Sequence, residues 1–169
     1  MHDIHQDEIL EVREMRWRRR QSLAVGWPAL LSVTLCIPLP ARGDSCFSAW
    51  FHKQCQVLIR HLSGAGFAPV CLDISDTLDG PMMLTGCHCT AASLKRLCVK
   101  LEETLPGGRL LDLDVMGQDL HAWSRSDLGL PPRQCFLCGK DAAVCVVTRA
   151  HTREELISFA KEQLNLQAT

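Results

Sequence analysis

Two aspartates interrupt an apolar run in the second half of the chain, and this pattern constrains the fold more than any other. Asp112 and Asp114 alternate with leucine and valine in the sequence Arg-Leu-Leu-Asp-Leu-Asp-Val-Met. This composition predicts a strand over residues 109–116. Side chains two residues apart leave the same face of a strand, with their Cα atoms about 6.5 Å apart. The segment therefore predicts a sheet that carries two neighbouring carboxylates on one face.

A divalent cation would explain why the two carboxylates stand together. Mg²⁺ binds through one or two carboxylates together with substrate phosphates, so the pair predicts a Mg²⁺ or Mn²⁺ site. On its own, Asp-x-Asp is more typical of a strand with one solvated face. The upstream Gly107-Gly108-Arg109 favours a phosphate site, because glycine permits close backbone approach and arginine offers a charge-assisted contact. Arg109 faces away from the aspartates in a regular strand, so its role requires a bend.

A second group of metal-binding residues follows in an irregular segment, residues 124–144, and just beyond it. Cys135-x-x-Cys138 precedes Gly139, and Cys145 and His151 lie further on. Three thiols and an imidazole suit tetrahedral zinc, and four protein ligands make a site structural rather than catalytic. The spacing of the last two residues is untypical of zinc sites, and the chain has 10 cysteines. Free buried thiols are therefore the alternative.

Length and composition restrict the class of protein. The 169 residues predict one domain, 1–169, able to bury about 70% of the surface of its unfolded chain. A formal net charge of −1 and the absence of tyrosine argue against nucleic acid and membrane as partners. Most cysteines lie in apolar runs, which indicates a reducing, cytoplasmic compartment. An arginine-rich stretch precedes the apolar run 22–40 as in a secretory signal, but prolines interrupt that run, and a buried strand explains it better.

Hydrophobic periodicity predicts the order of elements. We expect helices over residues 5–20, 47–64, 90–105 and 152–164. We expect strands over residues 29–37, 67–74, 82–89, 109–116 and 120–123, with Asp79-Gly80 as a turn signal. Strands mixed with helices predict a single α+β or α/β domain, and of these we expect the α+β fold, a mixed sheet with flanking helices.

Arginines outside the strand are further candidates for phosphate binding. Arg125 and Arg133 lie in the irregular segment between the two groups of ligands, although single surface arginines are solvated by default. Arg13 and Arg16 lie on the first predicted helix, three residues apart. Two cations at this spacing repel each other unless an anion or an acid lies between them.

The chain resembles the family of apo-citrate lyase phosphoribosyl-dephospho-CoA transferases, also called holo-citrate lyase acyl carrier protein synthases. Residues 108–115 are similar to the family signature G-R-L-x-D-[IL]-D-V. The residues around Arg125 and Arg133, the Cys/His cluster, and the early Arg-Glu-x-Arg follow in the family's order. The resemblance covers nearly the whole chain. It departs at Leu39, where the family usually has glycine, and at Arg42, which replaces a lysine.

This resemblance implies a transferase. Its donor is triphosphoribosyl-dephospho-CoA, its acceptor is a serine of the citrate lyase acyl carrier (gamma) subunit, and pyrophosphate leaves. The resemblance implies a catalytic role for Arg109 and for the metal-binding Asp112 and Asp114. The residues implied in donor binding are Gly108, Arg125, Arg133, Arg42, Arg13 and Arg16. A related transferase of malonate decarboxylase implies a fold similar to nucleotidyltransferases.

Two other hypotheses remain at this point. One is a non-enzymatic zinc-bearing adaptor that binds a carrier protein or a lyase subunit. The other is a degenerate family member that keeps the fold without the activity, which the departure at Leu39 suggests.

Overall fold

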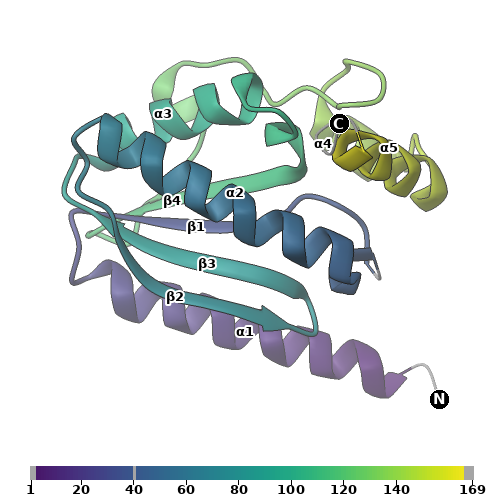
Figure 1. Ribbon diagram of the computed structural model, residues 1–169, viewed down its shortest axis with the longest axis horizontal. Helices are drawn as coiled ribbons and strands as arrows, with labels where there is room; N and C mark the ends of the chain where they lie inside the picture. Colours follow the sequence, from purple (N-terminus) through teal and green to yellow (C-terminus); the bar gives the residue numbers. More distant parts are fainter. Residues whose placement is uncertain (1–2, 40, 166–169) are drawn as a thin grey trace.

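The computed structural model describes residues 3–39 and 41–165. Within them, a five-stranded sheet with the order β2-β3-β1-β4-β5 lies between helices (Figure 1). The strands are β1 (Ala29–Leu35), β2 (Val70–Thr77), β3 (Gly80–Cys87), β4 (Leu111–Gly117) and β5 (Ala122–Trp123). The helices are α1 (Asp3–Ala24), α2 (Ser45–Gly64), α3 (Ala91–Thr104), α4 (Ala142–Thr148) and α5 (Arg153–Asn165). The prediction of a single α+β domain is confirmed.

Each neighbouring pair of these strands is antiparallel, whereas the sequence predicted a mixed sheet. The reason lies in the connections. Helix α2 joins β1 to β2, and β3 lies between these two strands; helix α3 joins β3 to β4, and β1 lies between them. Strands joined by a helix run in the same direction but are never neighbours, which is the split β-α-β arrangement.

The two faces of the sheet differ in chemistry. Helices α2 and α3 cover one face and α1 covers the other (Figure 1). The main apolar core lies on the α2 and α3 side, where Leu31, Val33, Leu111 and Leu113 pack against apolar residues of both helices. Because side chains alternate along a strand, the residues between them face α1. These are Ser32 and Thr34 of β1 and Asp112 and Asp114 of β4.

The register places these polar residues side by side. Thr34 pairs with Asp112, and Ser32 pairs with Asp114. The predicted strand with two carboxylates on one face is therefore confirmed, but it starts at Leu111 rather than at residue 109, because residues 108–110 form a 3-10 turn. This turn bends the chain at Arg109, but the Arg109 side chain contacts Gln134 rather than the two aspartates.

Several predicted boundaries were wrong. Strands β2 and β3 lie at 70–77 and 80–87, so the central residues of their turn are Leu78 and Asp79 rather than Asp79 and Gly80. Helix α4 was not predicted: it begins within the expected irregular segment 124–144 and continues beyond it, and the Asp141 side chain caps it by accepting a hydrogen bond from the Ala143 amide. Among the described residues, no helix has the length and apolar character needed to cross a membrane.

Candidate active site

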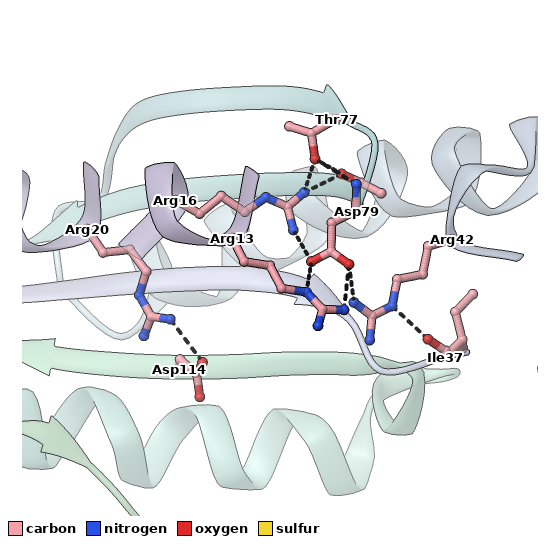
Figure 2. A network of polar contacts seen from close by, with 9 residues as sticks. Arg13, Arg16, Arg20, Ile37, Arg42, Thr77, Asp79 and Asp114 are labelled. Carbon is pink, nitrogen blue, oxygen red and sulfur yellow. Dashed lines mark hydrogen bonds and ion pairs between the residues drawn. The ribbon is translucent and has the colours of Figure 1, made fainter. Parts of the chain in front are cut away.

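Three arginines converge on one buried carboxylate between α1 and the sheet. Arg13 and Arg16 of α1 lie 2.9 and 3.1 Å from the carboxylate oxygens of Asp79, in the turn between β2 and β3. Arg42, from the 3-10 turn Ala41–Gly43 after β1, reaches the same carboxylate at 3.1 Å. Figure 2 shows the three guanidinium groups around Asp79. The side chain of Asp79 is only 6% exposed, so its carboxylate meets the three guanidinium groups away from bulk water.

Asp79 is the acid that the spacing of Arg13 and Arg16 requires. The sequence indicated only that an acid or anion must lie between the two arginines, and it treated Asp79 as part of a turn. The pKa of Arg16 is lowered by burial, and Arg42 and Arg13 lower it further against the opposing effect of Asp79. Three cations around one carboxylate leave an excess of positive charge, so the cluster can accept a further anion.

A cavity of about 210 Å³ lies beside this cluster, between α1 and the sheet. Its lining residues are Arg13, Arg16, Trp17, Arg20, Ser32, Thr34, Asp79 and Met82. Because Ser32 and Thr34 pair with Asp114 and Asp112 in the next strand, the arginine-lined cavity and the carboxylate pair share one face of the sheet. We call this combined region the arginine–aspartate site.

The carboxylate pair is half-exposed and has cationic partners. Asp114 lies 3.3 Å from Arg20 of α1, and Asp112 lies 3.3 Å from Arg133. The Asp114–Arg20 contact is visible in Figure 2. Burial raises the pKa of Asp112, the negative charge of Asp114 raises it further, and Arg133 lowers it. Two half-exposed carboxylates that repel each other form an oxygen donor set that fits Mg²⁺ or Mn²⁺.

Arg133 also fixes the start of β4. Its guanidinium donates to the carbonyl oxygens of Arg109 and Leu111, at 3.0 and 2.8 Å. Arg109 in turn donates to the carbonyl oxygen of Gln134. The guanidinium of Arg109 therefore holds the segment that carries Arg133, and no described contact joins it to the carboxylate pair.

The structure places two predicted site residues away from the arginine–aspartate site. Arg125 pairs with Glu102 and Glu103 of α3, at 3.0 and 2.8 Å. Gly108 is buried, and a Cβ atom there would lie 2.6 Å from the carbonyl oxygen of Leu101 in α3. The glycine thus permits close packing against α3, which differs from the phosphate contact that the sequence suggested.

The loop after β1 meets the site through Arg42. Besides Asp79, Arg42 donates through Nε to the carbonyl oxygen of Ile37 at 2.7 Å. Leu39 is half-buried in this loop.

A larger, shallow cavity of about 890 Å³ lies at the other end of the sheet, between the start of α3 and the β4–β5 turn. None of the predicted site residues lines this cavity. The larger of the two cavities is therefore not the candidate active site.

The predicted cysteine and histidine ligands come together at one point. One ligand atom each from Cys135, Cys138, Cys145 and His151 lies within 4.8 Å of the others, a geometry that fits one metal ion. The Sγ atoms of Cys138 and Cys145 are 3.5 Å apart without a disulfide bond. Burial opposes ionisation of Cys135, but hydrogen bonds from the backbone amides of Cys138 and Leu137, together with those from the Cys138 and Cys145 thiols, lower the pKa of this thiol to about 7.

The fold and the site together define an α+β protein with a charged, arginine-lined site on one face of an antiparallel sheet. The family described as apo-citrate lyase phosphoribosyl-dephospho-CoA transferase matches residues 4–167, and the chain belongs to this family.

Individual relatives agree with this assignment. The chain is 29% identical over 163 residues to a probable apo-citrate lyase phosphoribosyl-dephospho-CoA transferase of Vibrio cholerae serotype O1, covering 92% of this chain and 89% of the relative. It is 28% identical over 165 residues to the transferase of the same name from Shigella flexneri serotype 5b, covering 97% and 90%. It is 31% identical over 172 residues to protein CitXG of Leuconostoc mesenteroides subsp. cremoris, covering 94% of this chain but 34% of that longer protein.

Proposed function

We propose that this protein transfers the phosphoribosyl-dephospho-CoA group to the acyl carrier subunit of apo-citrate lyase. The family description names this group and apo-citrate lyase; the acyl carrier subunit as the acceptor is part of the proposal. The observation that carries the proposal is the arginine–aspartate site, in which a cavity lined by cations lies beside two carboxylates on the same sheet face. A donor with a triphosphate requires both parts, because phosphoryl transfer depends chiefly on positioning and on neutralising charge.

The donor in this proposal is triphosphoribosyl-dephospho-CoA, and the chemistry is of the nucleotidyltransferase type. The hydroxyl oxygen of a carrier serine attacks the phosphorus nearest the ribose. A bond forms between this oxygen and phosphorus, the bond from phosphorus to the bridging oxygen breaks, and pyrophosphate leaves with the bonding electrons. The hydroxyl proton passes to solvent. The product is a phosphodiester on the carrier.

Asp112 and Asp114 hold Mg²⁺ or Mn²⁺ in this proposal. The cation, when bound, neutralises charge on the phosphate oxygens and on the leaving group. The two carboxylates supply its oxygen ligands, and their half-exposed position leaves room for donor oxygens. Arg20 and Arg133, which already contact these carboxylates, keep the pair oriented towards the cavity.

The cluster of Arg13, Arg16 and Arg42 forms the triphosphate-binding region in this proposal. Arg13 is the most exposed of the three, with 48% of its side chain accessible, against 10% for Arg16. Arg13 therefore contacts the donor directly, while Arg16 and Asp79 hold the cluster together. Guanidinium groups suit this task because they donate paired hydrogen bonds to phosphate oxygens.

Arg109, Arg125 and Gly108 receive different roles from the ones that the resemblance implied. Arg109 positions the segment of Arg133 through its contact with Gln134. Arg125 ties residues 124–128 to α3, and Gly108 permits close packing.

The free thiols of the described chain fit the reducing cytoplasm, where we place the reaction. We propose no nucleic-acid or membrane partner.

A transfer assay tests the proposal. Purified protein is incubated with the apo-carrier subunit, triphosphoribosyl-dephospho-CoA and Mg²⁺, and the intact mass of the carrier and the pyrophosphate released are measured. The expected result is one added prosthetic group and one pyrophosphate per carrier. A carrier whose attachment serine is replaced by alanine is the control and should keep its mass.

The alternative function, a non-enzymatic zinc-bearing adaptor, rests on the Cys/His cluster. It predicts a complex between this protein and the carrier, with the carrier's mass unchanged in the presence of donor. The same assay therefore separates the two functions.

A further inference from the structure

The segment from Gly129 to His151 buries very few of its side chains. Among its residues, Cys135 and Cys145 alone are buried. Val146 and Val147 of α4 are 77% and 83% exposed. A segment of this length with so few buried side chains lacks the hydrophobic stabilisation that fixes a chain, and small units of this kind depend on a disulfide or a metal.

The two buried residues belong to the cluster of four potential ligands. The cysteine residues are free thiols, so no disulfide takes the place of a core. The Nε2 atom of His151 is buried and has no hydrogen-bond partner among the described residues. A buried polar atom without a partner is costly. A metal ion bound by the histidine ring and the three thiols would remove that cost.

The backbone around Cys135 has the shape of a metal-binding turn. The Gln134–Asp141 bridge and the hydrogen bond from the Cys135 amide to the Lys140 carbonyl close a short hairpin around Cys135 and Cys138. Gly139 makes the turn possible at φ +71°. Helix α4 then brings Cys145 back to the same point.

The distances suit zinc. Thiolates that bind zinc at about 2.3 Å in a tetrahedron lie about 3.8 Å from one another. Cys138 and Cys145 have their Sγ atoms 3.5 Å apart, and the four ligand atoms lie within 4.8 Å. Sulfur and imidazole ligands without a carboxylate select zinc over Mg²⁺ or Ca²⁺.

We propose that Cys135, Cys138, Cys145 and His151 hold a structural zinc ion that clamps the segment of Arg133 onto the start of β4. Arg133 directly precedes the hairpin, and the amide of Ala142, which leads into α4, donates to its carbonyl oxygen at 2.8 Å. Its guanidinium reaches Asp112 and the carbonyl oxygens of Arg109 and Leu111. Zinc binding thus fixes the arginine that orients Asp112. The importance of Arg133 for orienting Asp112 rests on the proposed function, whereas the zinc site itself does not.

Metal analysis of the purified chain tests the zinc site without donor or carrier. Protein prepared under reducing conditions without chelator should hold about one zinc per chain. Cys138→Ser should hold less than about a tenth of that amount. Cys46→Ser removes an exposed thiol outside the cluster and should keep its zinc. A wild-type chain that lacks zinc and takes up none on titration, or that carries a Cys138–Cys145 disulfide, overturns the proposal.

Trypsin cleavage and hydrogen exchange test the clamp. Removal of zinc by a chelator should speed cleavage after Arg133, Lys140 and Arg149 about tenfold, and should speed amide exchange at residues 109–112. Adding zinc back should reverse both changes. Arg133→Ala should speed exchange at 109–112 while zinc stays bound. Exchange at 109–112 that is unaffected by zinc removal overturns the clamp. Because these measurements need no turnover, they fail or succeed independently of the transferase assay.

Discussion

Asp79 and Arg16 form a 3.1 Å ion pair between the β2–β3 turn and α1, across 63 residues of sequence. Arg13 and Arg42 share the same carboxylate. A single acid therefore fixes α1 against the sheet and holds three cations in place.

Asp79→Asn should destabilise the fold, because it leaves three crowded arginines without their counter-charge. Loss of one partner of a buried ion pair typically costs about 3 kcal/mol, which lowers the melting temperature by about 6–12 °C in a chain of this size. Asp76→Asn, in the same hairpin, is the control: Asp76 is 58% exposed, so its loss should cost less than about 1 kcal/mol. Equal melting temperatures of the two variants would contradict a structural role for Asp79.

Arg13→Ala should weaken donor binding more than it weakens the fold, because this side chain is half-exposed at the cavity. We expect the KM for the donor to rise about tenfold, the loss of one charge-assisted contact. Arg18→Ala is the matched control, since Arg18 lies on the same helix and pairs at the surface with Glu14. If the two variants show the same KM, the cavity does not bind the donor.

Mg²⁺ should stabilise the wild-type protein but not Asp112→Asn or Asp114→Asn. At a concentration 100 times its dissociation constant, a ligand stabilises the folded state by about 2.7 kcal/mol, which thermal melting detects. Both variants should fold and lack transferase activity. A Mg²⁺-dependent rise in melting temperature that survives both substitutions would place the cation elsewhere.

The raised pKa of Asp112 gives a pH dependence. In metal-free protein, a carboxyl whose folded-state pKa is raised contributes stability below its unfolded pKa and loses that contribution as the pH rises through the raised pKa. Wild type should therefore lose stability relative to Asp112→Asn over this range. Protons compete with Mg²⁺, so half-saturation should need more Mg²⁺ as the pH falls through the raised pKa. A half-saturating concentration that does not change with pH would contradict the assignment of Asp112 as a ligand.

Leu39→Gly separates two roles of the loop after β1. If the loop approaches the donor beside Arg42, glycine should lower the donor KM with little change in kcat, because close backbone approach becomes possible. If Leu39 serves only in packing, its half-buried side chain accounts for about 1 kcal/mol of stability. The melting temperature would then fall and the KM would stay the same.

Gly108→Ala tests why glycine precedes Arg109. Its Cβ would lie 2.6 Å from the Leu101 carbonyl, so we expect a loss of about 1–3 kcal/mol from overpacking without a change in donor KM. Gly43→Ala, where a Cβ meets no atom within 4 Å, is the control. A higher KM at unchanged stability would restore the phosphate contact at Gly108.

Features that depend on residues close together in the sequence were predicted from the sequence. The alternation around Asp112 and Asp114 predicted their common face, and the spacing of Arg13 and Arg16 predicted an anion or an acid between them. Asp79 itself was missed, because a partner more than 60 residues away leaves no periodic signal. Helix α4 was missed because it has 7 residues and exposes all three of its valines. The partners of Arg109 and Arg125 depend on tertiary packing, so their residue types alone suggested a phosphate site.

The most direct measurement compares the intact mass of the apo-carrier after incubation with the donor and either wild-type protein or Asp114→Asn, with and without Mg²⁺. Wild type with Mg²⁺ should add one prosthetic group to each carrier, and removal of the cation should stop the reaction. Asp114→Asn, folded to the same extent by thermal melting, should leave the carrier unmodified. Carrier modification by Asp114→Asn at the wild-type rate, in the presence of excess chelator, would contradict the assignment of the carboxylate pair as the metal site of the transfer.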